Sequence, residues 1–320
     1  MNIRSILGKK WLWPYLGAVI VFIIIAFVSK SPWDTLSASI VFASFYILVG
    51  IGQMLVITTG PGNIDLSIPN TIAFSASLAF SIMNESNMNI PFGVVAGLLG
   101  GAAMGAFNYS LIRFILMPPM IATMASSFII RSVSITYFRG MQIKPPSGLE
   151  AFVNLRLFEV EGVFRGIPLI FIFAVVVALF MQLVLTRSSY GRRIHAIGQN
   201  IKAAWLCGVN VKAYKLLTYV LSGVFAALTG ILLAAFSGGA TLNMGDEYML
   251  NSIAVVVMGG SSIAGGSSNS IGIIGAAVLL YLITNLLNIL GMGAGLRYIF
   301  TGLVIVGIIF LSGEKMRRRG

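Results

Sequence analysis

Long apolar runs recur along the whole chain, and they constrain its fold more than any other feature. The runs cover residues 12–29, 36–57, 64–83, 92–112, 120–138, 167–185, 216–236, 250–258, 271–290 and 296–311. A helix that crosses a bilayer needs about 20 consecutive apolar residues. Since backbone polar groups in lipid must be paired within the chain, such runs favour helices. The sequence therefore predicts an all-α, polytopic membrane protein with about ten transmembrane helices.

The composition agrees with a chain whose solvent is lipid. Hydrophobic residues make up 58% of the sequence and charged residues 9%, and the mean hydropathy is +0.95, values typical of membrane proteins. Ten spans would use roughly 200 residues, so we expect one transmembrane domain over residues 1–320. With one cysteine and one histidine, the chain cannot build a disulfide framework or a histidine-based metal cluster.

Positive charge predicts how the chain is oriented. Most of the 21 lysines and arginines lie before residue 11, within 186–215, or after residue 314. Basic residues near spans mark the cytoplasmic side, so we expect both termini and the segment 186–215 to be cytoplasmic. The segment 139–166, which carries both signs of charge, is then external. The net charge of +12 is read as this orientation signal and not as a nucleic-acid surface.

Two features concern how the helices pack. The runs that end at 56–62 (VITTGPG) and 256–260 (VVMGG) both lead through a polar, glycine-containing turn into another run, which predicts two halves related in parallel. Gly97, Gly101 and Gly105 recur at four-residue spacing, which permits close approach of helices in lipid. We favour contacts within the chain over a dimer interface for these glycines.

The segment 186–215 carries basic residues and no acid, with an apolar stripe at helical spacing. The stripe consists of Ile194, Ile197, Ile201, Trp205 and Val209, which predicts a basic amphipathic helix. Such a helix either lies on the anionic inner leaflet or docks into a groove on a cytoplasmic partner. The pattern alone leaves both open.

Three motifs carry a resemblance to a known family. The stretch 190–211 resembles the ATPase-coupling segment of the ribose-, xylose- and arabinose-type ABC importer permeases, 245–266 resembles their glycine-rich signature, and 64–67 (Ile-Asp-Leu-Ser) resembles their motif at the start of the third span. The matching coupling residues are Gly191, Arg192, Ala196, Gly198, Asn200, Ala203, Ala204 and Gly208. The turn 60–63 (GPGN) departs from the family pattern, which leaves the substrate open.

The resemblance implies the partners of the chain and favours docking for the segment 186–215. It implies a second permease copy, as a homodimer or a paralogous heterodimer, two cytoplasmic ATP-binding subunits, and an external solute-binding protein. It also implies a bacterial inner membrane. The chain has no G-x-x-x-x-G-K-[ST] phosphate loop, so we expect ATP and magnesium on the partner, no cofactor on this chain, and no enzyme activity of its own.

Two other classes of transporter remain as alternatives to a sugar importer. A branched-chain amino-acid ABC permease has the same general architecture. A stand-alone secondary carrier predicts ionisable residues along its path, and the runs hold few, chiefly Asp65 and Arg131. Copurification with an ATPase separates the carrier from both importers.

Candidate contacts for the solute are amide, hydroxyl and aromatic side chains within the runs. A neutral polyol needs hydrogen bonds and stacking surfaces but no fixed charge. The candidates are Asp65, Asn70, Phe74, Ser75, Asn251, Asn285 and Asn288. Each has a structural alternative, namely interhelical hydrogen bonding and packing, or capping of a helix N-terminus in the case of Asp65. These residues do not say which sugar is carried.

Overall fold

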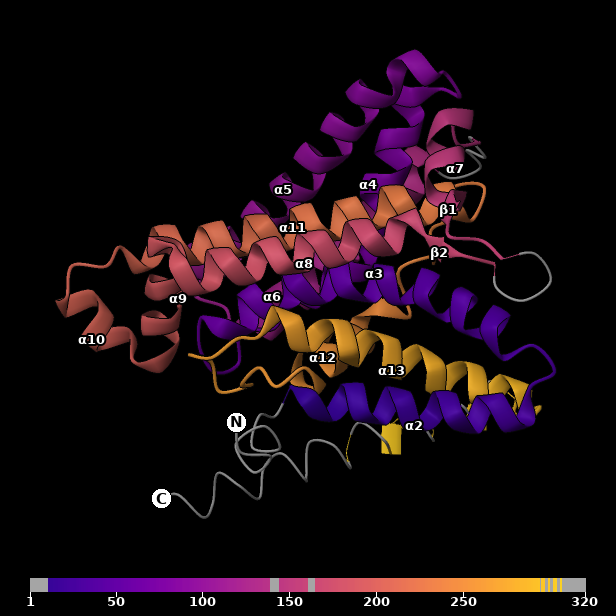
Figure 1. Ribbon diagram of the computed structural model, residues 1–320. Coiled ribbons are helices and arrows are strands. Elements are labelled where there is room, and N and C mark those ends of the chain that lie inside the picture. The colour runs from indigo at the N-terminus through magenta and orange to yellow at the C-terminus, as the bar shows by residue number, and fades with distance from the viewer. Residues whose placement is uncertain are drawn as a thin grey trace, which may run out of the picture.

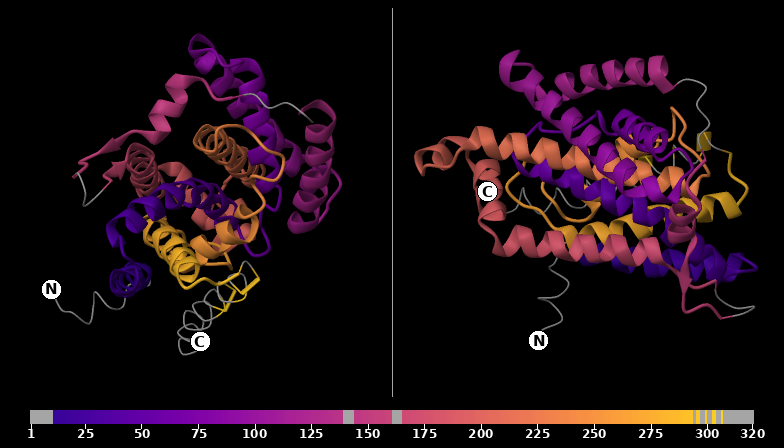
Figure 2. Two further views of the ribbon diagram at one scale, coloured as in Figure 1. Left: turned by 90° about the vertical axis from the view of Figure 1, so that its right-hand side faces the viewer. Right: turned by 90° about the horizontal axis from the view of Figure 1, so that it is seen from above.

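The computed structural model describes residues 11–138, 144–160 and 165–293, together with positions 295, 296, 299, 302, 303 and 306. Most of its long helices lie side by side, with their axes roughly along a common line (Figures 1 and 2). The basic residues before residue 11 and after residue 314 lie outside the described residues, as does most of the predicted run 296–311. Over the described ranges the prediction of an all-α fold is confirmed.

The described elements are helical apart from one short strand pair. The helices are α2 (Leu12–Val28), α3 (Pro32–Thr58), α4 (Ile68–Met83), η1 (Asn87–Asn89), α5 (Ile90–Phe114), α6 (Pro119–Phe138), α7 (Ser147–Asn154), α8 (Leu169–Arg187), α9 (Ser189–Gln199), α10 (Ile201–Leu206), α11 (Val211–Phe236), α12 (Tyr248–Met258) and α13 (Ser270–Ile289). Strands β1 (Arg156–Leu157) and β2 (Ile167–Pro168) pair antiparallel. Each predicted run from 12–29 to 271–290 coincides with a helix, with shifts of a few residues at its ends.

Among the described residues, six helices are long and apolar enough to cross a membrane: α3, α5, α6, α8, α11 and α13. Helices α2, α4 and α12 are apolar but shorter, with 17, 16 and 11 residues. The chain is therefore a multi-pass integral membrane protein. The count of ten spans stays a prediction.

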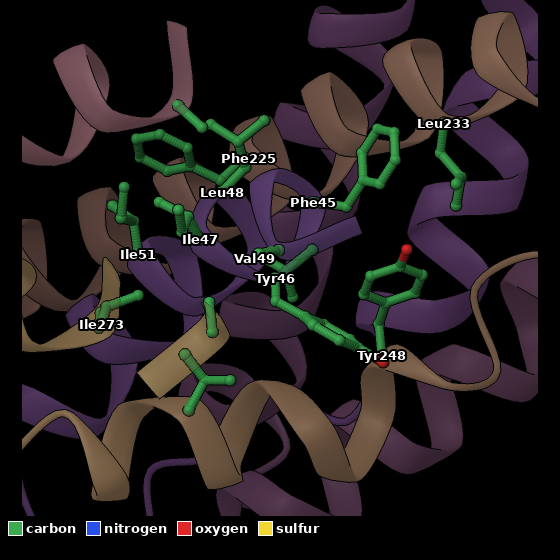
Figure 3. Close-up of a cluster of buried hydrophobic side chains, with 14 of the residues drawn as sticks. Phe45, Tyr46, Ile47, Leu48, Val49, Ile51, Phe225, Leu233, Tyr248 and Ile273 are labelled. Atoms are coloured by element: carbon green, nitrogen blue, oxygen red, sulfur yellow. The ribbon is translucent and has the colours of Figure 1, made fainter. Parts of the chain in front are cut away.

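Helix α3 forms the centre of the bundle. It is largely apolar on all sides, as a helix buried on all sides must be, and its residues 43–58 are all buried. It packs against α8, α11, α12 and α13. Figure 3 shows Phe45 and Leu48 of α3 among side chains such as Phe225, Tyr248 and Ile273. Peripheral helices instead expose apolar side chains, among them Phe27, Leu99, Phe128 and Phe180, as expected toward lipid.

Glycines permit a close helix crossing between α5 and α11. A Cβ atom at Gly101 or Gly105 would overlap the carbonyl groups of Gly223 and Tyr219 respectively. The backbones therefore touch where the four-residue glycine spacing predicted close approach. Gly97 likewise faces Ile231 of α11 and Ala79 of α4. The prediction that these glycines make contacts within the chain is confirmed.

The two segments predicted to lie on opposite sides of the membrane lie at opposite ends of the bundle. Helices α9 and α10 project from one end, and α7 with the β1–β2 pair covers the other (Figures 1 and 2). At the second end Arg165 pairs with Asp34 at 3.3 Å, and Arg156 donates a hydrogen bond to Ser37. Residues 139–143 and 161–164 of this segment lie outside the described residues.

Candidate functional site

Asp65 lies in the turn between α3 and α4, and its carboxylate is buried inside the bundle with 1% of the residue exposed. Its Oδ1 accepts hydrogen bonds from the Ser67 amide at 3.0 Å and from the Ser67 hydroxyl at 2.6 Å. Its Oδ2 accepts one from the Ser222 hydroxyl of α11 at 2.8 Å. A buried carboxylate is tolerated only with such donors. The N-cap of α4 is Ser67 and not Asp65, so Asp65 fixes the turn before the helix rather than the helix end itself.

The hydrogen bonds of Asp65 extend to three further helices. The Asn108 amide of α5 donates to Ser67 Oγ at 2.6 Å and to Asp65 Oδ1 at 3.4 Å. Asn108 also accepts from Ser126 of α6, and Gln53 of α3 accepts from the Asp65 amide at 3.3 Å. We call these residues, with Ser67 and Ser222, the Asp65 network; it joins α3, α5, α6 and α11 around the start of α4.

Sequence reasoning found Asp65, and the family motif at 64–67 included Ser67, but the other four members of the Asp65 network were missed. The available signal was a polar residue inside an apolar run, which is costly in lipid unless it has a partner. Gln53, Asn108, Ser126 and Ser222 all meet that description. Many other serines in the runs do too, and they bond only to their own helix, as Ser110 does. The signal was therefore too weak to select these four.

Replacing Asp65 with alanine is expected to destabilise the protein strongly, because Ser67, Ser222 and Asn108 would lose a buried hydrogen-bond acceptor. We expect the free energy of unfolding to fall by roughly 3 kcal/mol for Asp65→Ala. It should fall less for Asp65→Asn, which keeps one acceptor oxygen. Thermal unfolding of the detergent-solubilised protein measures both. Ser110→Ala on α5 is the control and should unfold like the wild type. An unaltered melting temperature for Asp65→Ala would contradict a structural role for Asp65 and favour a contact with the solute.

Two of the three other α4 candidates contact α6. The Asn70 amide donates to Ser127 Oγ at 2.7 Å, and the ring of Phe74 lies 5.9 Å from that of Phe138. Ser75 is fully buried, and its hydroxyl has no hydrogen-bond partner in the part of the chain that the structure describes. Asn70 and Phe74 therefore form one group between α4 and α6, whereas the Ser75 carbonyl lies against Gly97 of α5.

The remaining candidates form a second group against α3. The Asn251 amide of α12 donates to the Tyr46 hydroxyl at 3.0 Å, and that of Asn285 on α13 donates to Ser39 Oγ at 2.7 Å. Asn288 lies one turn further along α13. Aromatic rings adjoin these amides: Tyr46 lies 5.1 Å from Tyr248, and Phe42 stacks on Tyr281 at 4.7 Å. The structure therefore divides the predicted solute contacts between two places.

The segment 186–215 is not the single amphipathic helix that its apolar stripe predicted. Asn200 adopts an extended conformation between α9 and α10, and its side-chain oxygen accepts from the Ala203 amide at 3.0 Å. Asparagine is among the best N-cap residues, so it ends one helix and begins the next. Ile194 and Ile197 of α9 are fully buried in the chain's own core, whereas Ile201 and Trp205 of α10 are exposed.

The eight predicted coupling residues divide in the same way. Gly191 and Ala204 are buried, and Ala196 and Gly198 are half-buried. Arg192, Asn200, Ala203 and Gly208 are exposed. Trp205 and Leu206 of α10, 68% and 76% exposed, join these residues at the end of the bundle. We call Ile201, Lys202, Ala203, Trp205 and Leu206 the α10 surface.

His195 on α9 is held by the turn before α13. Its Nε2 lies 2.7 Å from the Ser268 hydroxyl. Burial lowers the pKa of the imidazole from its usual value, so the ring is neutral near pH 7. In the part of the chain that the structure describes, no three His, Cys, Asp or Glu residues gather as metal ligands would.

Comparisons with known proteins agree with this architecture over nearly the whole chain. The family model described as "Branched-chain amino acid transport system / permease component" matches residues 35–309. The ribose import permease protein of Bacillus subtilis is 31% identical over 304 residues, 94% of this chain and 92% of that protein. That of Escherichia coli K12 is 30% identical over 319 residues, 98% of this chain and 97% of that protein.

A third relative, the autoinducer 2 import system permease protein of Salmonella typhi, is 30% identical over 302 residues, 93% of this chain and 84% of that protein. No solved structure gives a significant match. The chain therefore belongs to the family of branched-chain amino-acid-type transport-system permease components.

Proposed function

We propose that this chain is the membrane subunit of an ATP-driven importer for a monosaccharide or a sugar-like molecule. The observation that carries the proposal is the match to ribose import permeases of two organisms along more than nine-tenths of the chain. The autoinducer 2 permease adds a second cargo to the relatives. A branched-chain amino-acid cargo is not favoured, although the family description names that class.

The α10 surface supports a cytoplasmic ATPase as the partner. It exposes Trp205 and Leu206 beside Lys202, and α9 exposes Arg192 at the same end of the bundle. An exposed apolar patch rimmed by polar residues is typical of a protein interface. Tryptophan and arginine are the residues most enriched at the energetic centres of interfaces. On this proposal ATP and magnesium belong to the partner, and the α9–α10 end faces the cytoplasm, with both termini on that side.

The opposite end then faces outward, where an external solute-binding protein would dock on α7 and the β1–β2 pair. A second permease copy, identical or paralogous, would complete the solute path in a bacterial inner membrane. Within this chain the group around Tyr46, Asn251 and Asn285 suits a polyol better than the α4 group, because aromatic faces and amides lie together there. Stacking and neutral hydrogen bonds are what a sugar requires.

Reconstitution in liposomes tests the proposal. The purified chain alone should neither hydrolyse ATP nor take up ribose, whereas the chain with its ATPase and a ribose-loaded binding protein should do both. Parallel assays with autoinducer 2 and with leucine identify the cargo class. Uptake by the chain alone, driven by an ion gradient, would establish a secondary carrier instead. Leucine uptake in place of ribose uptake would establish the amino-acid alternative.

A further inference from the structure

Two glycine-containing turns, one after α3 and one after α12, meet beneath α9 at one end of the bundle. The Gly266 amide donates a hydrogen bond to the Thr58 carbonyl at 2.9 Å. A Cβ atom added to Gly265 would lie 2.6 Å from the Cα atom of Gly60. Gly60, Gly265 and Gly266 all have positive φ angles, of 134°, 84° and 73°, which favour glycine. The two turns are therefore joined backbone to backbone, with no side chain between them.

Helix α9 sits on both turns through Gly198. A Cβ atom at this position would overlap the Thr58 carbonyl oxygen and the Gly266 amide nitrogen at once. Gly198, one of the predicted coupling residues, thus makes a close backbone contact within the chain. We call Thr58, Gly60, Gly198, Gly265 and Gly266 the glycine joint.

Side chains of α9 add hydrogen bonds to the second turn. His195 Nε2 lies 2.7 Å from Ser268 Oγ, and the Gln199 amide donates to the Gly266 carbonyl at 3.4 Å. On its other sides α9 is fixed by buried Ile194 and by Arg193, whose guanidinium lies 5.3 Å from the centre of the Tyr214 ring of α11. Because α9 is held on several sides, we expect it to move as a rigid body together with the turn before α13.

The geometry points to the glycine joint as the part that transmits motion from the α10 surface to the two turns. Only Asn200 separates α9 from α10. On one side of the glycine joint, Thr58 is followed by the turn 59–67, which contains Asp65 and precedes α4. The Gly266 side leads to α13. Because packed backbones have no rotamers to absorb a displacement, a push on α10 reaches both turns together. This inference rests on the proposed function, since it assumes that an ATPase docks on α10.

Gly198→Ala in the complete transporter tests the inference, because one methyl group separates α9 from both turns while the α10 surface is unchanged. The ATPase should still copurify at the wild-type ratio and hydrolyse ATP. Solute uptake per ATP hydrolysed should fall about tenfold, within the range of mutations that change coupling between sites. Ser189→Thr, which adds a methyl group at an exposed position of the same helix, is the matched control and should transport normally.

Uptake by Gly198→Ala equal to wild type would overturn the inference, and so would loss of ATPase association in parallel with uptake. Should Gly198→Ala fail to fold, His195→Ala and Ser268→Ala decide the matter. Each should lower uptake per ATP about threefold, the size of one hydrogen bond, and the double variant should be no worse than either. Wild-type coupling, or additive effects, in this cycle would contradict the inference. Failure of the unmodified chain to bind any ATPase would instead contradict the proposed function.

Discussion

Replacing Gly105 with leucine is expected to prevent the folded bundle from forming. Helices α5 and α11 cross with Gly105 against the Tyr219 carbonyl, where even a Cβ atom would overlap the backbone. The helices would have to separate along their whole contact, and the other close crossing at Gly101 and Gly223 would be lost with it. Overpacking at a backbone contact should cost roughly 3 kcal/mol or more. The yield of monodisperse protein after detergent extraction measures the loss.

Ala103→Leu is the matched control for this prediction. It adds a larger side chain to the same helix, but Ala103 is exposed, so the yield and melting temperature should stay near those of the wild type. Normal yield for Gly105→Leu would contradict the crossing. A loss for both variants would show that α5 tolerates no added bulk on either face, as expected if the exposed face contacts a second copy.

The α5–α11 crossing shows what the sequence predicts well and where it stops. Four-residue spacing identifies the face of α5 that packs closely, and the structure confirms that face. Spacing cannot name the partner, because any helix with a small residue at the right height would satisfy it. Gly223 and Ala227 of the partner helix also stand four residues apart, but Gly272 and Ala276 in another run have the same spacing, so the pattern does not say which pair of helices meets. The partner became known only from the tertiary structure.

The segment 186–215 shows the opposite case, in which a correct pattern led to a wrong element. Ile194, Ile197, Ile201 and Trp205 do follow helical spacing, but the first two are buried in the chain and the last two are exposed. Asn200 was the available signal for the break, since asparagine caps helices better than it continues them. The sequence analysis instead counted Asn200 among the coupling residues that the family resemblance implies.

Because the helix breaks at Asn200, Gly198 and Ala203 lie on different helices, and only one of them is suitable for testing docking. A tryptophan at Gly198 would disrupt the glycine joint inside the chain, so any loss of transport would have two explanations. Ala203 lies on α10 and is exposed. Ala203→Trp should therefore leave the bundle intact and act only on a partner placed against the α10 surface.

Leu206→Asp should abolish assembly with the ATPase while the permease remains folded in the membrane. Leu206 is 76% exposed, so an acid there costs the isolated chain little, but it would place an unpaired charge in an apolar contact. Loss of a central interface residue typically costs 2 kcal/mol or more, or about thirtyfold in affinity. Copurification of the ATPase from detergent, and ATP-dependent uptake in liposomes, should both fall by at least about that factor.

The control lies at the other end of the bundle. Leu155 is 50% exposed at the end of α7, and Leu155→Asp introduces the same charge at the end of the bundle that the proposed orientation places outside the cell. The Leu155→Asp variant should copurify with the ATPase as the wild type does, even if it weakens binding of the solute-binding protein to α7. If α10 only lies on the lipid surface, Leu206→Asp should weaken that lipid contact and leave ATPase association unchanged. Ala203→Trp should then have no effect on transport, because tryptophan suits a membrane interface. Normal association for both α10 variants would therefore assign the α10 surface to lipid and move the ATPase contact elsewhere on this end of the bundle.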